Sequence, residues 1–362
     1  MIRWTEAGRE REAPWRSAAG APPPSRVAVA DDRMNAATAY RLACEGTALL
    51  WRGDFHNARQ LLRALARRCN PAPAGAGFHR YRQAQSQRAR TLGMLLIPFA
   101  AGHTIPLRRA PDVREACEEV YGPATGPAVT PLRELLGVIG AHEWRRKGVE
   151  VPALGGRIHP HHGVFSPVRG EYVELVAEAP LPSGRAAFDV GTGTGVLAAL
   201  LARRGVERVV ATDLDPRAVA CACENVDRLG LGGQVSVLRA DLFPPGRAPL
   251  VVCNPPWLPA QPVSPLDHAV YDPGGRMLSG FLDGLGDHLE PGGEGWLVLS
   301  DLAERLGLRG PGELRAAVEA AGLRVKDRID TRPPHRRAAD PADPLSAARS
   351  GEITTLWRLT HR

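Results

Sequence analysis

The pattern of hydrophobic and polar positions changes near residue 150. Upstream, apolar residues recur at three- and four-residue steps through 37–68, 111–121 and 131–147, a spacing that predicts amphipathic helices. Downstream, short β-prone runs alternate with helical stretches, which is typical of an open, largely parallel sheet. The pattern predicts a mainly helical domain over residues 34–150 and an α/β domain over residues 151–362.

In the α/β half, strand-length runs alternate with helical spacing until the last two strands, which have no helix between them. That pair predicts an antiparallel hairpin that closes the sheet, joined by an arginine- and proline-rich loop over 330–350. The expected strands are 187–190, 208–212, 235–239, 250–253, 295–300, 323–329 and 353–359. The expected helices are 196–204, 216–229, 277–288 and 311–321.

Two segments outside these domains have weaker patterns. Residues 1–33 are rich in Arg, Glu, Ala and Pro and include three consecutive prolines at 22–24, a composition that predicts a disordered tail. Residues 155–167, just before the expected sheet, are predicted to form a small hairpin or an extended lead-in.

Charge is distributed unevenly along the chain. Residues 1–150 carry a net charge of +9 and residues 151–362 a net charge of −2, within a total of +7. Nearly all of the positive charge is arginine, since Lys147 and Lys326 are the only lysines. Two interpretations remain open: a high-GC coding bias, or contact of the basic half with a polyanion such as RNA or the ribosome.

Composition also bears on compartment. The longest apolar run, residues 94–102, is too short to span a bilayer, and the N-terminus lacks the pattern of a secretion signal. The six cysteines are scattered without a C-x-x-C pair. We therefore expect a cytoplasmic protein with free thiols, no membrane segment and no metal site.

A glycine turn follows the first strand of the expected sheet. Gly191, Thr192, Gly193 and Gly195 come directly after an apolar run that contains Asp189. Glycine permits a tight turn and lets a ligand approach the backbone closely. A dinucleotide fingerprint would need its third glycine one residue later, at the position of Val196, so this turn predicts a different nucleotide-like cofactor.

Asp213 ends the second expected strand. A carboxylate at a strand end is placed to accept both ribose hydroxyls of an adenosine. The alternative role, capping the following helix, is better suited to Asp215, which directly precedes Pro216.

The run Asn254-Pro255-Pro256-Trp257 follows the fourth expected strand. A planar NH2 group is a poor nucleophile because its lone pair is delocalised. The side-chain carbonyl of Asn254 and the backbone carbonyl of Pro255 can accept its two hydrogens and favour a pyramidal nitrogen. The two prolines make the turn rigid, and Trp257 offers a flat face for stacking. The run predicts a catalytic site, NPPW, for a planar nitrogen.

These motifs, over residues 164–299, resemble those of class I S-adenosylmethionine-dependent methyltransferases, especially release-factor glutamine N-methyltransferases and related small-domain enzymes that modify RNA bases. The segment 163–171 sits where release-factor enzymes carry Arg-Pro-x-Thr-Glu, but the Arg-Pro order is missing here. Trp257 also replaces their usual tyrosine.

The resemblance implies a Rossmann-like seven-stranded sheet, S-adenosyl-L-methionine as cofactor, and an N-terminal recognition domain. It implies that Asp189 faces the methionyl ammonium and that Asp241, with the neighbouring Leu242, contacts the adenine. It also implies a macromolecular substrate from the translation apparatus: a release-factor-like protein, a ribosomal protein or RNA.

The leading hypothesis is an N-methyltransferase acting on a glutamine amide or the exocyclic amine of an RNA base. A small-metabolite methyltransferase, and a non-catalytic RNA- or protein-binding module that retains a cofactor pocket, are the alternatives. The run His159-Pro160-His161-His162 is interpreted as a polar loop, because its spacing suits no single helix face.

Overall fold

The computed structural model describes residues 1–73, 75–124, 126–262, 267, 270–333 and 343–362. The chain divides into two compact units, Met1–Glu143 and Trp144–Arg362. The boundary lies upstream of the predicted residue 151, because β7 (Val149–Val151) pairs with β8 (Gly156–Ile158) inside the second unit. Only β8 of this pair lies within 155–167, where the sequence predicted a hairpin or an extended lead-in, so the observed hairpin begins upstream of the predicted range.

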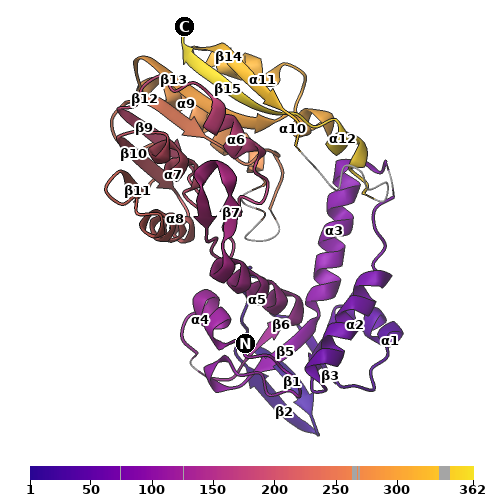
Figure 1. Cartoon of the computed structure of the whole chain (residues 1–362). Coiled ribbons are helices and arrows are strands. Elements are labelled where there is room, and N and C mark those ends of the chain that lie inside the picture. The colour runs from indigo at the N-terminus through magenta and orange to yellow at the C-terminus, as the bar shows by residue number, and fades with distance from the viewer. Residues whose placement is uncertain (74, 125, 263–266, 268–269, 334–342) are drawn as a thin grey trace. The chain divides into compact units, whose positions relative to one another are not determined.

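The second unit is built on a seven-stranded sheet, counted over the described residues, with the order β11-β10-β9-β12-β13-β15-β14 (Figure 1). All neighbours are parallel except β13–β15 and β14–β15, so the predicted closing hairpin is confirmed. The strands fall where the apolar runs predicted them: β9 (Ala186–Val190), β10 (Arg208–Asp213), β11 (Val235–Arg239), β12 (Ala248–Cys253), β13 (Leu289–Ser300), β14 (Leu323–Thr331) and β15 (Thr354–His361).

Helices cover both faces of this sheet. One face packs against α6 (Glu171–Glu178), α7 (Val196–Arg203) and α8 (Pro216–Arg228). The other packs against α9 (Arg276–His288) and α11 (Glu313–Ala320) (Figure 1). The short helices α10 (Leu302–Arg305) and α12 (Ser346–Ser350) follow β13 and precede β15; residues 334–342 of the predicted 330–350 loop lie outside the described chain.

The strand order reverses direction between β9 and β12. In an open sheet of this kind, the crevice at the carboxyl ends of the strands on either side of such a switch is where a ligand binds. Register matching brings the motifs together at that edge. Thr212 pairs with Val190, and Val190 pairs with Cys253, so Asp213, Gly191 and Asn254 are each the next residue along three adjacent strands.

The first unit contains a four-stranded sheet of order β3-β4-β5-β6 and a two-stranded hairpin, β1–β2. The strands are β1 (Ile2–Glu6), β2 (Arg9–Ala13), β3 (Arg26–Ala30), β4 (Thr47–Trp51), β5 (Leu95–Phe99) and β6 (Ala128–Pro131). The helices are α1 (Ala36–Cys44), α2 (Phe55–Arg68), α3 (Gly77–Gly93), α4 (Arg114–Tyr121) and α5 (Leu132–Lys147). Helices α1, α2, α4 and α5 lie at the stretches that the spacing predicted, whereas α3 was not predicted.

The prediction of a disordered tail over 1–33 is wrong, because three strands lie there. Ile2 and Ala13, paired across the hairpin, are buried, while Arg3 and Glu12 form an exposed ion pair on the other side. In β1 exposed residues alternate with buried or half-buried ones, and in β2 only Ala13 is buried, so charged residues occupy the solvent-facing positions of both strands. Composition averages over the two faces and misses that alternation.

Within the region 34–150 the sheet was not predicted, and its strand β4 interrupts the helical stretch expected over 37–68. Strands β4 and β5 are short runs of apolar residues buried on both faces. Such a run has neither the two-residue nor the 3.6-residue period that distinguishes a strand from a buried helix. None of the helices in the described ranges is long and apolar enough to cross a membrane.

A buried ion cluster ties the closing hairpin to the rest of the large sheet. Glu294 on β13 is 1% exposed. It accepts hydrogen bonds from Nε and Nη2 of Arg358 at 2.9 Å, from Lys326 Nζ at 2.6 Å and from Trp296 Nε1 at 3.0 Å. Burial acts to raise the pKa of Glu294, but these hydrogen bonds outweigh it and hold the pKa below its ordinary value.

Replacing Glu294 by Gln should lower the free energy of unfolding of the second unit by about 3 kcal/mol, because Arg358 would lose its buried counter-charge. Urea unfolding followed by tryptophan fluorescence measures this. The lowered folded-state pKa means that the stabilisation is present above the ordinary glutamate pKa of 4.5 and is lost as the pH falls through the folded value. The difference in free energy of unfolding between wild type and variant should therefore become smaller below pH 4.5.

Glu319→Gln is the matched control, since Glu319 is 65% exposed and lies 3.5 Å from Arg362. It should change stability by less than about 0.5 kcal/mol. Equal losses in the two variants would contradict a special role for the buried cluster.

Candidate active site

The glycine turn after β9 requires its glycines for backbone conformation and space. Gly191, Gly193 and Gly195 have φ values of 73°, 57° and 80°, in the left-handed region that disfavours side chains. A Cβ on Gly195 would lie 3.2 Å from Ala222 on α8, so this glycine lets α7 and α8 pack closely. A Cβ on Gly193 would meet nothing within 4 Å, so the turn is open there to an approaching ligand.

Asp189 is hydrogen-bonded to the turn and to the start of α7. Its Oδ2 accepts hydrogen bonds from Thr192 Oγ1 at 2.6 Å and from the backbone N–H of Ala198 at 3.0 Å. The side chain is almost fully buried, and this burial raises the pKa of Asp189 to about 6 against the effect of both hydrogen bonds. At neutral pH the carboxylate is therefore a buried negative charge at the edge where the strand order reverses.

Asp213 lies at the same edge. Its Oδ2 accepts from the backbone N–H of Gly193 and its Oδ1 from that of Asp215, both at 3.0 Å. Burial raises its pKa. Asp215, not Asp213, caps α8 by accepting from the N–H of Arg217, as the sequence predicted.

Asp241 has a more exposed position than the other two carboxylates. It follows β11 by two residues, its side chain is 56% exposed, and it pairs with Arg276 at 3.1 Å. Leu242 beside it has a φ of 72°, which is rare for a residue with a side chain. Its carbonyl accepts a hydrogen bond from Thr212 Oγ1, which anchors this strained backbone to the end of β10.

Asn254 and Trp257 are directly hydrogen-bonded. The indole Nε1 of Trp257 donates to Oδ1 of Asn254 at 2.9 Å, which fixes the orientation of the amide. Oδ1 keeps a second lone pair for another donor. Pro255 is buried and Pro256 half-buried between them, and none of the described residues donates to the backbone carbonyl of Pro255. The side-chain oxygen of Asn254 and the backbone oxygen of Pro255 can thus each accept a hydrogen bond from a ligand at this turn.

One face of the Trp257 ring is covered by Arg169, whose Cζ lies 5.1 Å from the ring centroid. Arg169 is held in turn by two buried carboxylates: Glu171, which accepts from Nε at 2.6 Å, and Glu352, which accepts from Nη2 at 3.1 Å. Ser300 Oγ also donates to Glu352 at 2.7 Å. The segment 163–171 therefore packs at the Asn-Pro-Pro-Trp turn.

From the sequence, Arg169 was part of the segment 163–171 but had no predicted role. Glu352 and Ser300 were not predicted as site residues. The signal for Arg169 was its place in the segment 163–171. Glu352 follows the 330–350 loop and reaches the site only through the antiparallel return of β15, which no local pattern reports.

Beyond the turn, Leu258 exchanges backbone hydrogen bonds with Val270 and Asp272. The carboxylate of Asp272 accepts from the backbone N–H groups of Met277 and Leu278 and so caps the start of α9. This connection fixes where the chain leaves the Asn254 turn.

The histidines of the 159–162 run have other partners. His159 Nδ1 contacts the carbonyl of Arg145 at 2.6 Å, and His161 Nε2 contacts Glu224 at 2.7 Å. Across the described residues, no group of three or more His, Cys, Asp or Glu side chains is arranged to hold a metal ion.

Comparisons with known proteins agree with these motifs. The family described as ribosomal protein L11 methyltransferase (PrmA) matches residues 175–289. A ribosomal protein L11 methyltransferase from Pelotomaculum thermopropionicum is 37% identical over 40% of this chain and 40% of its own length. A release factor glutamine methyltransferase from Cereibacter sphaeroides is 35% identical over 38% of this chain and 51% of its own length. These matches span about half the length of the relatives or less.

Longer matches also occur. Among solved structures, a methyltransferase from Pyrococcus furiosus is similar at 19% identity, with a TM-score of 0.42, over 62% of this chain and 98% of that one. A ribosomal protein L11 methyltransferase from Bordetella bronchiseptica is 32% identical over 58% of this chain and 69% of its own length. The chain belongs to the class I S-adenosylmethionine-dependent methyltransferases, in the family that includes ribosomal protein L11 methyltransferases and release factor glutamine methyltransferases.

Proposed function

We propose that this chain transfers the methyl group of S-adenosylmethionine to a planar nitrogen of a macromolecule in the translation apparatus. The acceptor is a protein glutamine amide or the exocyclic amine of an RNA base. Relatives named for ribosomal protein L11 and for release factors support a protein of that apparatus as the first candidate.

The observation that carries this proposal is the hydrogen bond from Trp257 to Asn254. It orients Oδ1, whose remaining lone pair can accept one hydrogen of an acceptor NH2, while the carbonyl of Pro255 can accept the other. Accepting both hydrogens favours a pyramidal nitrogen with its lone pair available. A preorganised pair of acceptors lowers the barrier because it needs no rearrangement when the reaction occurs.

Arg169 supports this arrangement as a positioning residue. Its guanidinium group, held by Glu171 and Glu352, stacks on Trp257 and keeps the indole N–H aimed at Asn254. A cation above a tryptophan face is attracted by the ring and contributes about 1–2 kcal/mol when partly desolvated.

The cofactor would supply an activated methyl group on a sulfonium. Gly191, Thr192, Gly193 and Gly195 would bring the backbone close to it, and the open side of Gly193 fits this role. The carboxylate of Asp189 would balance the methionyl ammonium, and Asp213 would accept the ribose hydroxyls. Asp241 and Leu242 would contact the adenine.

The basic first unit would then recognise the macromolecule, in keeping with its net charge of +7 from 20 Arg and 13 Asp or Glu over residues 1–143. A small-metabolite acceptor and a non-catalytic binding module are the rival functions. The intact Asn-Pro-Pro-Trp geometry disfavours a module that has lost catalysis.

The full-length protein, incubated with methyl-tritiated S-adenosylmethionine and extract from cells that lack the gene, should label a protein fraction. Separation of RNA, protein and small molecules measures this. Label in RNA would move the acceptor to a base amine. Label only in small molecules would support the metabolite alternative, and bound cofactor without transfer would support the binding module.

Asn254→Ala should lower turnover by roughly a hundredfold, on the order of losing one preorganised hydrogen-bonding group. Its cofactor affinity should stay close to wild type, because no cofactor role is assigned to that side chain. Single-turnover assays and calorimetry separate the two quantities. Unchanged turnover would contradict the proposed role.

Cofactor affinity should fall as the pH drops below 6. Because the pKa of Asp189 is raised to about 6, this carboxyl is ionised above that pH and becomes neutral below it, so the attraction for the ammonium is lost on acidification. Affinity at pH 5 should be about tenfold lower than at pH 7. Asp189→Asn should bind more weakly at pH 7 and lose most of this pH dependence in calorimetric titrations. A variant with an unchanged pH profile would exclude Asp189 as its source.

A further inference from the structure

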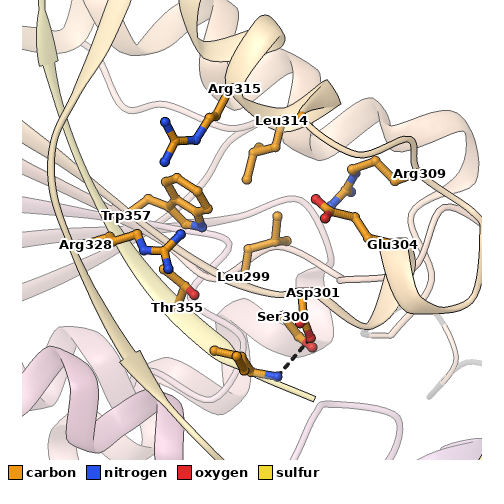
Figure 2. A pocket seen from close by; sticks show the side chains of 12 residues that line it. Leu299, Ser300, Asp301, Glu304, Arg309, Leu314, Arg315, Arg328, Thr355 and Trp357 are labelled. Carbon is orange, nitrogen blue, oxygen red and sulfur yellow. Dashed lines mark hydrogen bonds between the residues drawn. The ribbon is translucent and has the colours of Figure 1, made fainter. Parts of the chain in front are cut away.

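A cavity of about 230 Å³ lies between the closing hairpin of the large sheet and helix α11 (Figure 2). Leu299 and Leu314 form part of its wall, and Trp357 and Thr355 of β15 form another part. Its charged lining is mainly arginine, from three separate elements. They are Arg309, before α11, Arg315, on α11, and Arg328, on β14.

Two of these arginines are arranged around Trp357. The guanidinium carbon of Arg315 lies 5.9 Å from a Trp357 ring centroid, and that of Arg328 lies 5.7 Å away (Figure 2). The Trp357 ring attracts the two guanidinium groups and so orients them. Because they lie over the ring, Trp357 is a poor platform for stacking a nucleic-acid base, which needs a free ring face.

The positive charge in this cavity is only partly neutralised. Arg328 pairs with Asp330 at 2.8 Å. Neither Arg309 nor Arg315 makes a hydrogen bond or ion pair with any residue in the described ranges. Burial lowers the pKa of Arg309, and the charges of Glu304, Glu313 and Asp272 act in the opposite direction.

The acidic lining residues leave a net positive balance. Asp301 is already engaged by Arg305 at 2.7 Å and by the backbone N–H of Ile353 at 2.8 Å. Glu304 is therefore the remaining carboxylate of the described lining that can offset the positive charges of Arg309 and Arg315. This local excess contrasts with the net charge of −2 over residues 151–362.

Part of the cavity lining comes from the strand next to the one that precedes Asn254. Ser300 and Asp301 of its lining end β13, the strand next to β12, at the carboxyl edge where Asn254 follows β12. Asp272 acts electrostatically on Arg309, and its backbone is hydrogen-bonded to Leu258, the residue after Trp257. The cavity and the turn therefore involve neighbouring strands at the same edge of the sheet.

We propose that this cavity binds an Asp or Glu carboxylate of the protein substrate, at a residue near the methylated one. Guanidinium groups match carboxylates with paired N–H donors, and the cavity is of side-chain size. The proposed function is needed only to assign the carboxylate to the protein that is methylated. The chemistry of the cavity is independent of methyl transfer and can be tested without it.

The test uses full-length protein with ¹⁵N-labelled tryptophan indoles, with the Trp357 resonance assigned from Trp357→Phe. The probes are N-acetyl-glutamate amide and its neutral isostere N-acetyl-glutamine amide. The glutamate probe should shift the Trp357 indole resonance saturably, and the glutamine probe should leave it in place. Arg315→Gln should lower the affinity for the glutamate probe by about tenfold, because one charge-assisted contact is lost.

Arg324→Gln is the matched control, because Arg324 lies on the same strand as Arg328 but outside the cavity lining. It should give the wild-type titration. Asn254→Ala should do the same, so a failure of methyl transfer would not obscure the result. Retained cofactor binding by Arg315→Gln shows that the variant is folded.

Three outcomes would overturn the proposal. They are equal shifts with the two probes, an undiminished titration in an Arg309→Gln, Arg315→Gln double variant, and a Trp357 shift with a uridine oligonucleotide but not with the glutamate probe. The last would assign the cavity to a phosphate backbone and favour RNA as the partner.

Discussion

The site depends on the register of three adjacent strands. Because Thr212, Val190 and Cys253 are paired across β10, β9 and β12, the residues that follow them emerge together at the carboxyl edge where the strand order reverses. A shift of one residue in any of these strands would turn its side chains to the opposite face. The glycine turn, Asp213 and Asn254 are therefore held by backbone pairing before any of their side chains interacts.

Buried carboxylates organise this edge in two ways. Asp189 and Asp213 each accept N–H or O–H donors from the glycine turn, which fixes the loop and leaves buried negative charge beside it. Glu171 and Glu352 instead neutralise Arg169, which stacks on Trp257. The first pair places negative charge beside the glycine turn, while the second holds the arginine that covers the Trp257 ring. Asp189, Glu171 and Glu352 are buried and Asp213 is half-buried, so their arrangement is sensitive to loss of any partner.

Much of the second unit was predictable because local patterns determine it. Each of its large-sheet strands lies where an apolar run predicted it, and the lack of a helix between the last two correctly indicated an antiparallel pair. The first unit was less predictable. Its buried strands β4 and β5 have no diagnostic period, and the first hairpin has a charged outer face that resembles disorder in composition.

The sequence by itself predicted the class of enzyme that the relatives support, because a glycine turn and an Asn-Pro-Pro-Trp run after two strands are local patterns along the chain. It also determined which strand ends carry them. Only the tertiary structure decided that Trp257 donates to Asn254, that Arg169 covers the ring, and that Glu352 arrives from a distant strand. Likewise, the arginines around Trp357 come together only through packing of α11 on the closing hairpin. Such contacts join residues far apart in sequence, and no periodicity along the chain encodes them.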